Sequence, residues 1–536
     1  MTKTNTLAAA HIGVAIAAFA VASLMGVLQG LSVADVSFPQ RSEQLYYLSV
    51  TAHGVLMALV FTTFFIMGLG YVLSQATLDR IVGRRTGWFA FWLAVVGSVA
   101  AAYTILTGQS TVLYTFYPPL QAHPLFYIGA TLLVVGSWIW GGVMIASIRG
   151  WRRDHPGQPI PLSMHGTLAN IIIWYLATAG LAIEVVGMLI PWSLGWVDTI
   201  DPMLARTFFW WFGHPLVYFW LLPAYVLWYS VLPRVAGGRL FSDSLGRMVF
   251  ILFVLLSTPV GFHHQFADPG ISAGWKLAHT VTTYAILYPS FVTAFTVIAS
   301  LEVAGRLKGA KGLFNWIGRL PWKDPFFASV ALAILAFTFG GFGGAINAAY
   351  AMNSMVHNTA WIMGHFHLTL GTTVTLSFMG ATYWLMPRIL GRELRLPRLA
   401  LVQPYLWFLG MAFFSTSYHV AGLRGLPRRV YSALLTGEYG QTWHGLTVVA
   451  AVGGVILFVS ALAFVIVVAS TWLGGRRTEV PFEFALALRP ATVPGIWDRF
   501  GLWTVVAVAL VVLAYAYPIW TLFSQTRYGS PGFTPF

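Results

Sequence analysis

Cysteine is absent from the sequence, and charged residues are scarce. None of the 536 residues is cysteine, which excludes disulfides, thiolate metal sites, iron–sulfur clusters and covalently attached c-type haem. Charged residues make up 9% of the chain, against roughly 25% in a typical soluble protein. These absences rule out a soluble globular enzyme, and they require any bound metal to be held by histidine or by oxygen ligands.

Apolar residues take the place of the missing charge. They make up 58% of the chain, and the mean hydropathy is +0.74. A membrane-spanning helix needs roughly 20 mostly apolar residues, and the charges are clustered so that many such stretches are uninterrupted. A transmembrane β-barrel is excluded because its strands would alternate in polarity. The composition therefore predicts an all-α polytopic membrane protein.

Hydrophobic segments of the required length occur thirteen times. The first is too long for a cleaved signal peptide and lacks a small-residue cleavage pattern. No internal repeat and no separate soluble domain is visible, so we expect one membrane-embedded domain over residues 1–536. The predicted spans are 8–30, 47–75, 88–107, 125–148, 167–192, 207–233, 246–267, 276–304, 326–349, 357–387, 401–423, 444–473 and 500–523.

The basic residues support this number of spans and give an orientation. With the N-terminus in the cytoplasm, 23 of the 30 lysines and arginines fall on the cytoplasmic side and 7 on the outer side. Cytoplasmic loops of membrane proteins carry such an excess. The net charge of +14 is therefore an orientation signal, and no nucleic acid is expected as a partner.

Histidine is the ionisable residue that recurs inside the predicted spans. An ionisable residue within a bilayer is a functional candidate by default, and neutral imidazole is a common metal ligand. A single buried histidine is more often bonded to a backbone carbonyl of a neighbouring helix. Nine of them, some paired at ligand-like spacing, favour metal ligation: His53, His214, His263, His264, His279, His365, His367, His419 and His444.

The motif GHFH at residues 364–367 places two histidines on opposite faces of one helix. Consecutive helical residues turn by about 100°, so His365 and His367 point about 200° apart. They cannot easily ligate one metal, but they can ligate two centres on either side of the helix. His53 stands alone in its span, where Gly54 is predicted to let a flat macrocycle approach closely.

A further histidine begins a row of tyrosines. His214, Tyr218, Tyr225 and Tyr229 are spaced four, seven and four apart, which places them on one helical face. An aromatic packing stripe is the alternative interpretation. Hydroxyl groups that start at a histidine favour instead a polar path from His214 toward the cytoplasmic end.

Two adjacent histidines follow in the next span. His263 and His264 lie in a segment that Pro259 and Gly261 loosen. Both rings can therefore converge on one metal, with His214 as the third ligand. Three imidazoles suit copper or zinc.

Together these elements resemble subunit I of the haem-copper oxygen reductases, most closely the B family of ba-type cytochrome c oxidases. The likeness runs from the second predicted span to LPRRVY near residue 430 and therefore covers most of the chain. The thirteen spans also fit that family better than its relatives. The matching stretches are LYTFYPPL, WWFGHPLVYFWLLPAY, LSTPVGFHHQFADPG, MVHNTAW and GHFH.

The resemblance assigns six of the histidines to three metals. His53 and His367 look like the axial ligands of a low-spin haem b. His365 looks like the proximal ligand of a high-spin haem of a-type or o-type. The remaining three look like the ligands of Cu-B: His214, His263 and His264.

The reaction implied by the resemblance is reduction of O2 to water, coupled to proton uptake and proton pumping. Tyr218 looks like the catalytic tyrosine that is covalently joined to His214, four residues before it. Leu216 stands where the A family has a glutamate that ends one proton route, so a single route is expected. It would run through Tyr225, Tyr229, Ser242, Ser290 and Thr293.

Further residues resemble the family's cofactor-binding positions. Arg428 and Arg429 are similar to a pair of arginines that hold haem propionates, which a guanidinium fork suits. His357 matches a residue near the high-spin haem propionates, and Trp210 is another expected cofactor contact. Asn353 replaces an aspartate of the ba-type pattern, which is expected to alter proton exit and pumping without affecting O2 reduction.

Electrons are expected to enter from another chain. A Cu-A centre requires cysteine thiolates, so a subunit II would carry it and receive electrons from cytochrome c or a small copper protein. A small single-span subunit, membrane lipid and O2 are the other expected partners. The expected setting is a prokaryotic plasma membrane, crossed many times with the N-terminus in the cytoplasm.

Two alternative functions are less favoured. Nitric oxide reductase of the same superfamily lacks the cross-linking tyrosine and places glutamates near a non-haem iron, whereas Tyr218 is present and Leu216 is not acidic. A non-redox transporter with buried histidine relays would be colourless, so an optical spectrum separates it from an oxidase.

Overall fold

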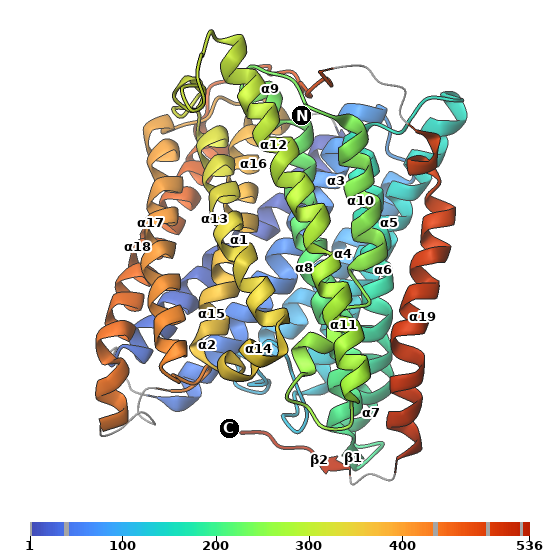
Figure 1. Ribbon diagram of the computed structural model, residues 1–536, viewed down its shortest axis with the longest axis vertical. Helices are drawn as coiled ribbons and strands as arrows, with labels where there is room; N and C mark the ends of the chain where they lie inside the picture. The colour runs from blue at the N-terminus through green and yellow to red at the C-terminus, as the bar shows by residue number, and fades with distance from the viewer. Residues whose placement is uncertain (1–2, 37–41, 432–437, 489–493, 526–528, 536) are drawn as a thin grey trace.

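The computed structural model describes residues 3–36, 42–431, 438–488, 494–525 and 529–535. Long helices run side by side along the tall axis of the molecule (Figure 1). Helix α1 (Lys3–Val33) begins at one end of this bundle and strand β2 (Ser530–Pro531) lies at the other. The chain therefore crosses the bundle an odd number of times.

Several helices are divided by a π-helical or 3-10 turn. In the first half of the chain, the elements after α1 are α2 (Glu43–Val55), η1 (Leu56–Phe61), α3 (Thr62–Leu78), α4 (Arg84–Leu106), α5 (Pro124–Asp154), α6 (Leu162–Glu184), η2 (Val185–Leu189), α7 (Ile190–Ser193), β1 (Thr199–Ile200), α8 (Pro202–Ser230), α9 (Leu232–Val235), α10 (Asp243–Leu256) and η3 (Gly261–Gln265). In the second half they are α11 (Ala273–Ala285), α12 (Leu287–Leu307), η4 (Ile317–Arg319), α13 (Pro325–Ala348), α14 (Tyr350–Val356), α15 (Ala360–Phe366), η5 (His367–Thr372), α16 (Thr373–Leu390), α17 (Pro397–Leu423), α18 (Glu438–Gly474), η7 (Gly495–Asp498), α19 (Phe500–Ser524) and β2.

The helices coincide with the predicted spans. Within the described residues, eleven helical segments are long and apolar enough to cross a membrane. The other two predicted spans, 246–267 and 357–387, correspond to α10 with η3 and to α15, η5 and α16. The all-α polytopic fold predicted from composition and periodicity is confirmed, and each of the thirteen predicted segments contains helix, with a non-helical break at residues 257–260 in the span 246–267.

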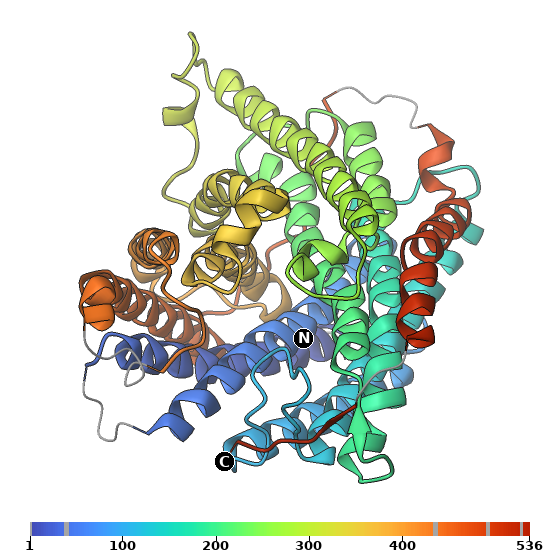
Figure 2. The same ribbon diagram turned by 60° about the horizontal axis from the view of Figure 1, so that its bottom comes forward.

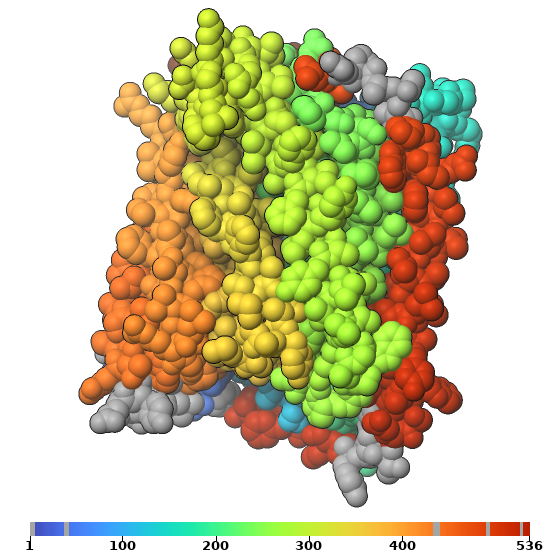
Figure 3. Space-filling model, in the orientation of Figure 1, coloured from blue at the N-terminus to red at the C-terminus, as the bar shows by residue number. Residues whose placement is uncertain are grey.

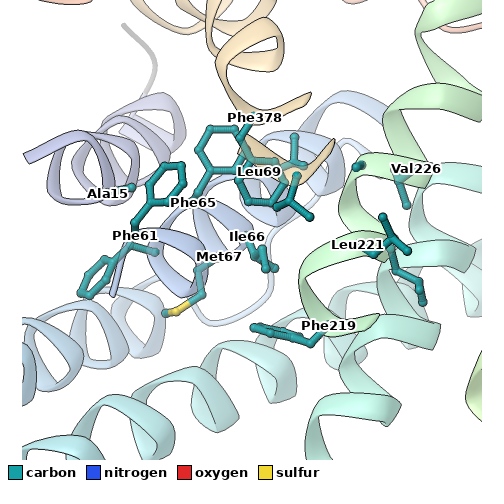
Figure 4. Close-up of a cluster of buried hydrophobic side chains, with 14 of the residues drawn as sticks. Ala15, Phe61, Phe65, Ile66, Met67, Leu69, Phe219, Leu221, Val226 and Phe378 are labelled. Atoms are coloured by element: carbon teal, nitrogen blue, oxygen red, sulfur yellow. The ribbon is translucent and has the colours of Figure 1, made fainter. Parts of the chain in front are cut away.

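Aromatic packing fills the centre of the bundle. Phe65 on α3 stacks on Phe378 of α16, with ring centres 4.2 Å apart and planes at 16°. Figure 4 shows these two rings between α1 and helix α8, which carries Phe219 and Val226. Such side chains bury large apolar areas, so this core fixes the relative positions of the helices that carry the buried histidines.

The outside of the bundle is apolar as well. Phe291, Phe295 and Val281 on the α11–α12 segment are 63%, 58% and 60% exposed. On one face of the molecule this segment stands beside α13 and α14 (Figure 3). An exposed apolar surface of this extent suits contact with lipid and not with water.

Candidate metal and haem sites

Three histidines converge where α8 meets η3. His214 projects from α8, and His263 and His264 come from the 3-10 turn. One ligand nitrogen from each ring lies within 4.8 Å of the other two. The backbone at Gly261 is pressed so closely against the Trp210 carbonyl and a tyrosine hydroxyl that a Cβ there would collide with both. Glycine is therefore needed where this turn enters the bundle.

Neighbouring side chains orient these rings. Nδ1 of His263 lies 2.9 Å from the hydroxyl of Thr283. The indole of Trp210 stacks on His264 with ring centres 3.7 Å apart and planes at 4°. Nδ1 of His214 and Nε2 of His264 are 3.0 Å apart. Metal-binding histidines commonly use their second nitrogen to fix ring orientation, as His263 does with Thr283. The cluster therefore suits one copper or zinc ion.

Tyr218 adds a hydroxyl to the cluster. Its oxygen lies 3.0 Å from Nε2 of His214, one helical turn away on α8. The tyrosine is buried, with 8% of its surface exposed. A buried hydroxyl within hydrogen-bonding distance of a ligand ring can hold and donate a proton at that position.

Two further histidines face each other across the bundle. His53 on α2 and His367 at the start of η5 have ring planes 10° apart and ring centres 6.2 Å apart. Nδ1 of His53 bonds to the Ala22 carbonyl at 2.8 Å, and Nδ1 of His367 bonds to the Met363 carbonyl at 2.9 Å. Each ring therefore keeps Nε2 for another partner.

The spacing of this pair fits a shared metal. An imidazole nitrogen lies about 1.1 Å from its ring centre and a metal–nitrogen bond is about 2.0 Å. Two rings on opposite sides of one metal thus have centres about 6 Å apart. His53 and His367 meet that requirement, so they suit the axial positions of one haem.

The first histidine of the GHFH motif, His365, turns away from this pair. His365 packs against α13, where a Cβ on Gly343 would collide with its Nδ1. Its ring lies nearly parallel to Trp361, at 18° and 5.7 Å. His365 and His367 thus contact different helices, as the predicted angle of about 200° requires.

The role predicted for Gly54 is wrong. A Cβ at Gly54 would collide with the side chain of Tyr114. The glycine therefore makes room for this tyrosine from the α4–α5 loop and not for a flat macrocycle.

Cationic and polar side chains gather beyond these sites, at the end where β2 lies. Arg429 places its guanidinium 4.4 Å from the ring centre of Tyr114, and its buried Nε has no hydrogen-bond partner. Arg428 donates to the Asn358 side chain at 2.8 Å. Burial, followed by the charge of Arg429, lowers the pKa of Arg428. Two crowded guanidinium groups with an unpartnered N–H suit an anionic ligand such as a carboxylate.

His357 and Asn353 lie at the same end. Nδ1 of His357 is 3.1 Å from Oδ1 of Asn353, whose amide nitrogen donates to the Asn347 carbonyl at 2.9 Å. Asn353 is buried, with 3% of its surface exposed. The asparagine therefore holds the imidazole in a fixed orientation.

The tyrosine row extends from the three-histidine cluster toward the other end of the bundle. Tyr229 donates to the Thr293 hydroxyl at 2.9 Å. Tyr225 is fully buried, and its hydroxyl lies near those of Ser290 and Thr293. Ser290 lies three residues before Thr293 on the same helix, α12. Ser242 accepts from the Leu245 N–H at 3.2 Å as the N-cap of α10, so its hydroxyl already has a structural role.

Other polar groups near these sites did not stand out in the sequence. Thr283 could not be recognised as part of the site from the sequence, because its contact is with His263, twenty residues away. Arg206 pairs with Asp268 at 3.0 Å, and burial raises the pKa of Asp268 despite that arginine. Glu184 is buried at the end of α6, and both of its carboxyl oxygens lack a hydrogen-bond partner.

Comparison with known proteins identifies the family. Residues 6–456 match the family model of cytochrome c and quinol oxidase polypeptide I. The chain belongs to this family. This oxidase subunit is 43% identical over 523 residues to cytochrome c oxidase subunit 1 of Thermus thermophilus, which covers 95% of the chain and 93% of that protein. It is 26% identical over 410 residues to haem-copper oxidase subunit I+III of Aeropyrum pernix, over 72% of the chain and 47% of that protein.

A solved structure has the same fold. The cryo-EM structure of a haem-copper terminal oxidase dimer covers 99% of this oxidase subunit and 95% of the matching chain, with a TM-score of 0.96 and 36% identity. The chain is therefore subunit I of a haem-copper cytochrome c oxidase, the catalytic subunit of a terminal respiratory oxidase. The family predicted from the sequence motifs is confirmed, and nitric oxide reductase is not favoured.

Proposed function

We propose that this oxidase subunit reduces O2 to water between His365 and the three-histidine cluster. His365 would hold the iron of a high-spin haem of a-type or o-type. A low-spin haem b would lie between His53 and His367. One observation carries this assignment: His365 and His367 of one motif contact different helices. His365 packs against α13, and the ring of His367 is nearly parallel to that of His53, with ring centres 6.2 Å apart. The ligands of Cu-B would be His214, His263 and His264.

When bound, the haems and the copper supply the electrons for O2 reduction. The residues of this chain fix geometry and handle protons. Thr283 keeps the His263 ring from turning, and Trp210 covers one face of His264. Tyr218 holds a proton on its hydroxyl beside Nε2 of His214 and donates it when oxygen is reduced.

Protons would reach Tyr218 along the tyrosine row. Tyr229 and Thr293 already share a hydrogen bond, and Tyr225 stands between this pair and Tyr218 on α8. A chain of hydroxyls passes protons because each can donate and accept. Ser290 and Ser242 complete the proposed route, Ser242 at its mouth near the start of α10.

Proton release would follow a different course at the opposite end. Arg428 and Arg429 are proposed to bind the haem propionates, with the unpartnered Nε of Arg429 as one donor. His357 lies near Arg428, and its Nδ1 contacts the side chain of Asn353. A neutral amide cannot accept a proton as an aspartate does, so residue 353 would orient His357 without itself carrying protons.

The whole chain is proposed to act as one membrane-embedded catalytic unit, with twelve spans forming the core and the thirteenth, α19, packed outside it. A subunit II carrying Cu-A would deliver electrons from cytochrome c or a small copper protein, and a small single-span subunit would complete the complex. The proposed location is a prokaryotic plasma membrane, with the N-terminus in the cytoplasm.

Spectroscopy and metal analysis of the purified holoenzyme test this function. We expect bands of two haems in the reduced-minus-oxidised spectrum, copper as well as iron in the protein, and O2 consumption with reduced cytochrome c. Pyridine extraction would identify the haem side chains. Iron without copper at the second site would reject the O2-reducing centre, and a colourless protein would reject the entire assignment.

A further inference from the structure

The loop between α12 and α13 is basic and carries exposed apolar side chains. Residues 306–323 contain five basic residues and no acidic residue. The loop stands out from the bundle, at the end where α1 begins (Figures 1 and 2). Four exposed cations lie in the loop itself, Lys308, Lys311, Arg319 and Lys323, whereas Arg306 at the end of α12 is paired with Glu302.

Large apolar side chains project from the same loop. Leu313 and Phe314 are 72% and 68% exposed, and Leu307, at the end of α12, is 67% exposed. Exposure of these apolar side chains to water is unfavourable in free energy, because apolar groups contribute stability when they leave water. Their position next to the ends of two membrane-spanning helices places them at the level of the lipid surface.

Two tryptophans give the loop a defined conformation. Trp316 packs closely against Gly305 at the end of α12, and its indole N–H donates to the Leu313 carbonyl at 2.9 Å. Trp322 donates to the Ile317 carbonyl at 2.8 Å. Tryptophan is enriched at membrane–water interfaces, so both its location and its bonding fit a loop that lies on a membrane.

An open cleft of about 480 Å³ lies within the loop. Lys311 and Arg319 line it together with Asn315, and the rest of the lining is glycine and alanine backbone. Lys308 donates to the Arg319 carbonyl at 3.4 Å and so closes the ends of the loop around the cleft. Two cations and an amide around an open space are complementary to a phosphate group.

We propose that this loop binds an anionic phospholipid of the adjacent leaflet. Lys311 and Arg319 would hold the phosphate in the cleft, while Leu313 and Phe314 insert between the acyl chains. Interfacial binding requires an apolar face that enters the lipid and cationic groups that attract anionic headgroups, and this loop has both. It is separate from the oxidase centre and would anchor one edge of the subunit.

Native mass spectrometry of the detergent-purified holoenzyme tests the proposal, with phosphatidylglycerol as the probe. We expect one tightly retained molecule of this lipid in the unmodified enzyme. A basic residue near a membrane surface contributes about 1 kcal/mol, which is roughly a 5-fold change in affinity. The double variant Lys311→Gln/Arg319→Gln should therefore bind the lipid about 25-fold more weakly, and its haem spectrum and O2 consumption should not change.

Matched variants distinguish a specific lipid site from a general effect of charge. Arg84→Gln/Arg85→Gln removes the same charge from the first turn of α4 and should leave the retained lipid in place. Leu313→Ser/Phe314→Ser keeps both cations of the cleft and should nevertheless lose it. Equal retention in all variants would overturn the proposal. Full retention of the lipid in the Leu313→Ser/Phe314→Ser variant would also overturn it and would indicate a site for free phosphate. So would the absence of retained lipid in the unmodified enzyme, which would indicate that a protein partner covers the loop.

Discussion

A buried ion cluster that fastens α19 to the bundle allows a quantitative prediction. Oδ1 of Asp498, just before α19, lies 2.9 Å from Nδ1 of His165 on α6 and 3.0 Å from Nη1 of Arg247 on α10. Oδ2 accepts from the Ile160 N–H at 3.0 Å. Arg247 also pairs with Asp243 at 2.7 Å. The side chains of Asp498 and Arg247 are only 9% and 3% exposed.

Asp498→Ala should destabilise the protein by about 3 kcal/mol, the lower end of the range for breaking a buried ion pair, because Arg247 keeps Asp243 as a partner. It also leaves the buried Ile160 N–H without an acceptor, and an unsatisfied buried donor costs about 1–3 kcal/mol of stability. In domains of 150–250 residues 1 kcal/mol shifts Tm by about 2–4 °C, and by less in longer chains. We therefore expect the thermal midpoint to fall by about 5 °C, measured from the loss of haem absorbance on heating.

The exposed pair of Asp154 with Arg80 is the matched control, because those side chains are 52% and 33% exposed. Exposed pairs contribute about 1 kcal/mol or less, so Asp154→Ala should barely change the midpoint. An unchanged midpoint in Asp498→Ala, or equal falls in both variants, would refute the reasoning.

The pH dependence of this effect has a definite sign. Burial opposes the charged form of Asp498, but the bond to His165 and the charge of Arg247 outweigh it, so the pKa of Asp498 lies below its usual value. A depressed carboxyl pKa stabilises the folded state above the unfolded pKa of about 4 and loses that contribution as pH falls through the folded value. The difference between wild type and Asp498→Ala should be constant from pH 6 to 8 and shrink in acid below about pH 4.

Three further predictions concern the metal sites. His365→Ala should remove the high-spin haem and retain the low-spin spectrum, and an unchanged CO-binding spectrum would contradict the assignment. Tyr218→Phe should retain both haems but lose turnover, and normal O2 consumption would refute its role as proton donor. Thr283→Val frees the ring of His263 and should weaken copper binding by about 10–100-fold, seen as a lower Cu:Fe ratio after dialysis. The control Thr280→Val, whose hydroxyl bonds only within its own helix, should leave that ratio unchanged.

Periodicity was sufficient to predict the parts of the site that depend on one helix. The angle between His365 and His367 follows from the helical repeat, and the two rings do contact different helices. The i, i+4 spacing likewise brought Tyr218 to His214. These predictions succeeded because a regular helix turns by a constant angle whatever surrounds it.

Contacts between distant segments could not be predicted in this way. The prediction for Gly54 was wrong because Tyr114, sixty residues later, occupies the space beside it. Thr283 has no recognisable pattern of its own and is significant only because α11 packs against η3. The docking of α19 through Asp498 involves a residue more than 300 positions from His165. Such pairings arise from tertiary packing, which local sequence patterns do not encode.

Both proposed axial ligands of the low-spin haem lie beside a π-helical turn. The segment Leu56–Phe61 begins three residues after His53, and His367 is the first residue of the segment His367–Thr372. A π-turn fits one more residue into the helix than an α-turn does, so each of these turns absorbs one residue while the α-helices on either side of it stay in phase. Deleting one residue from Leu56–Phe61 would convert this turn to an α-turn and keep His53 in phase with Phe65, whereas deleting one α-helical residue on either side of it would turn the ligand by about 100° relative to Phe65. In the second case one axial ring would be lost from the pair although no histidine had been changed, so deletions beside these π-turns are under stricter constraint than deletions within them.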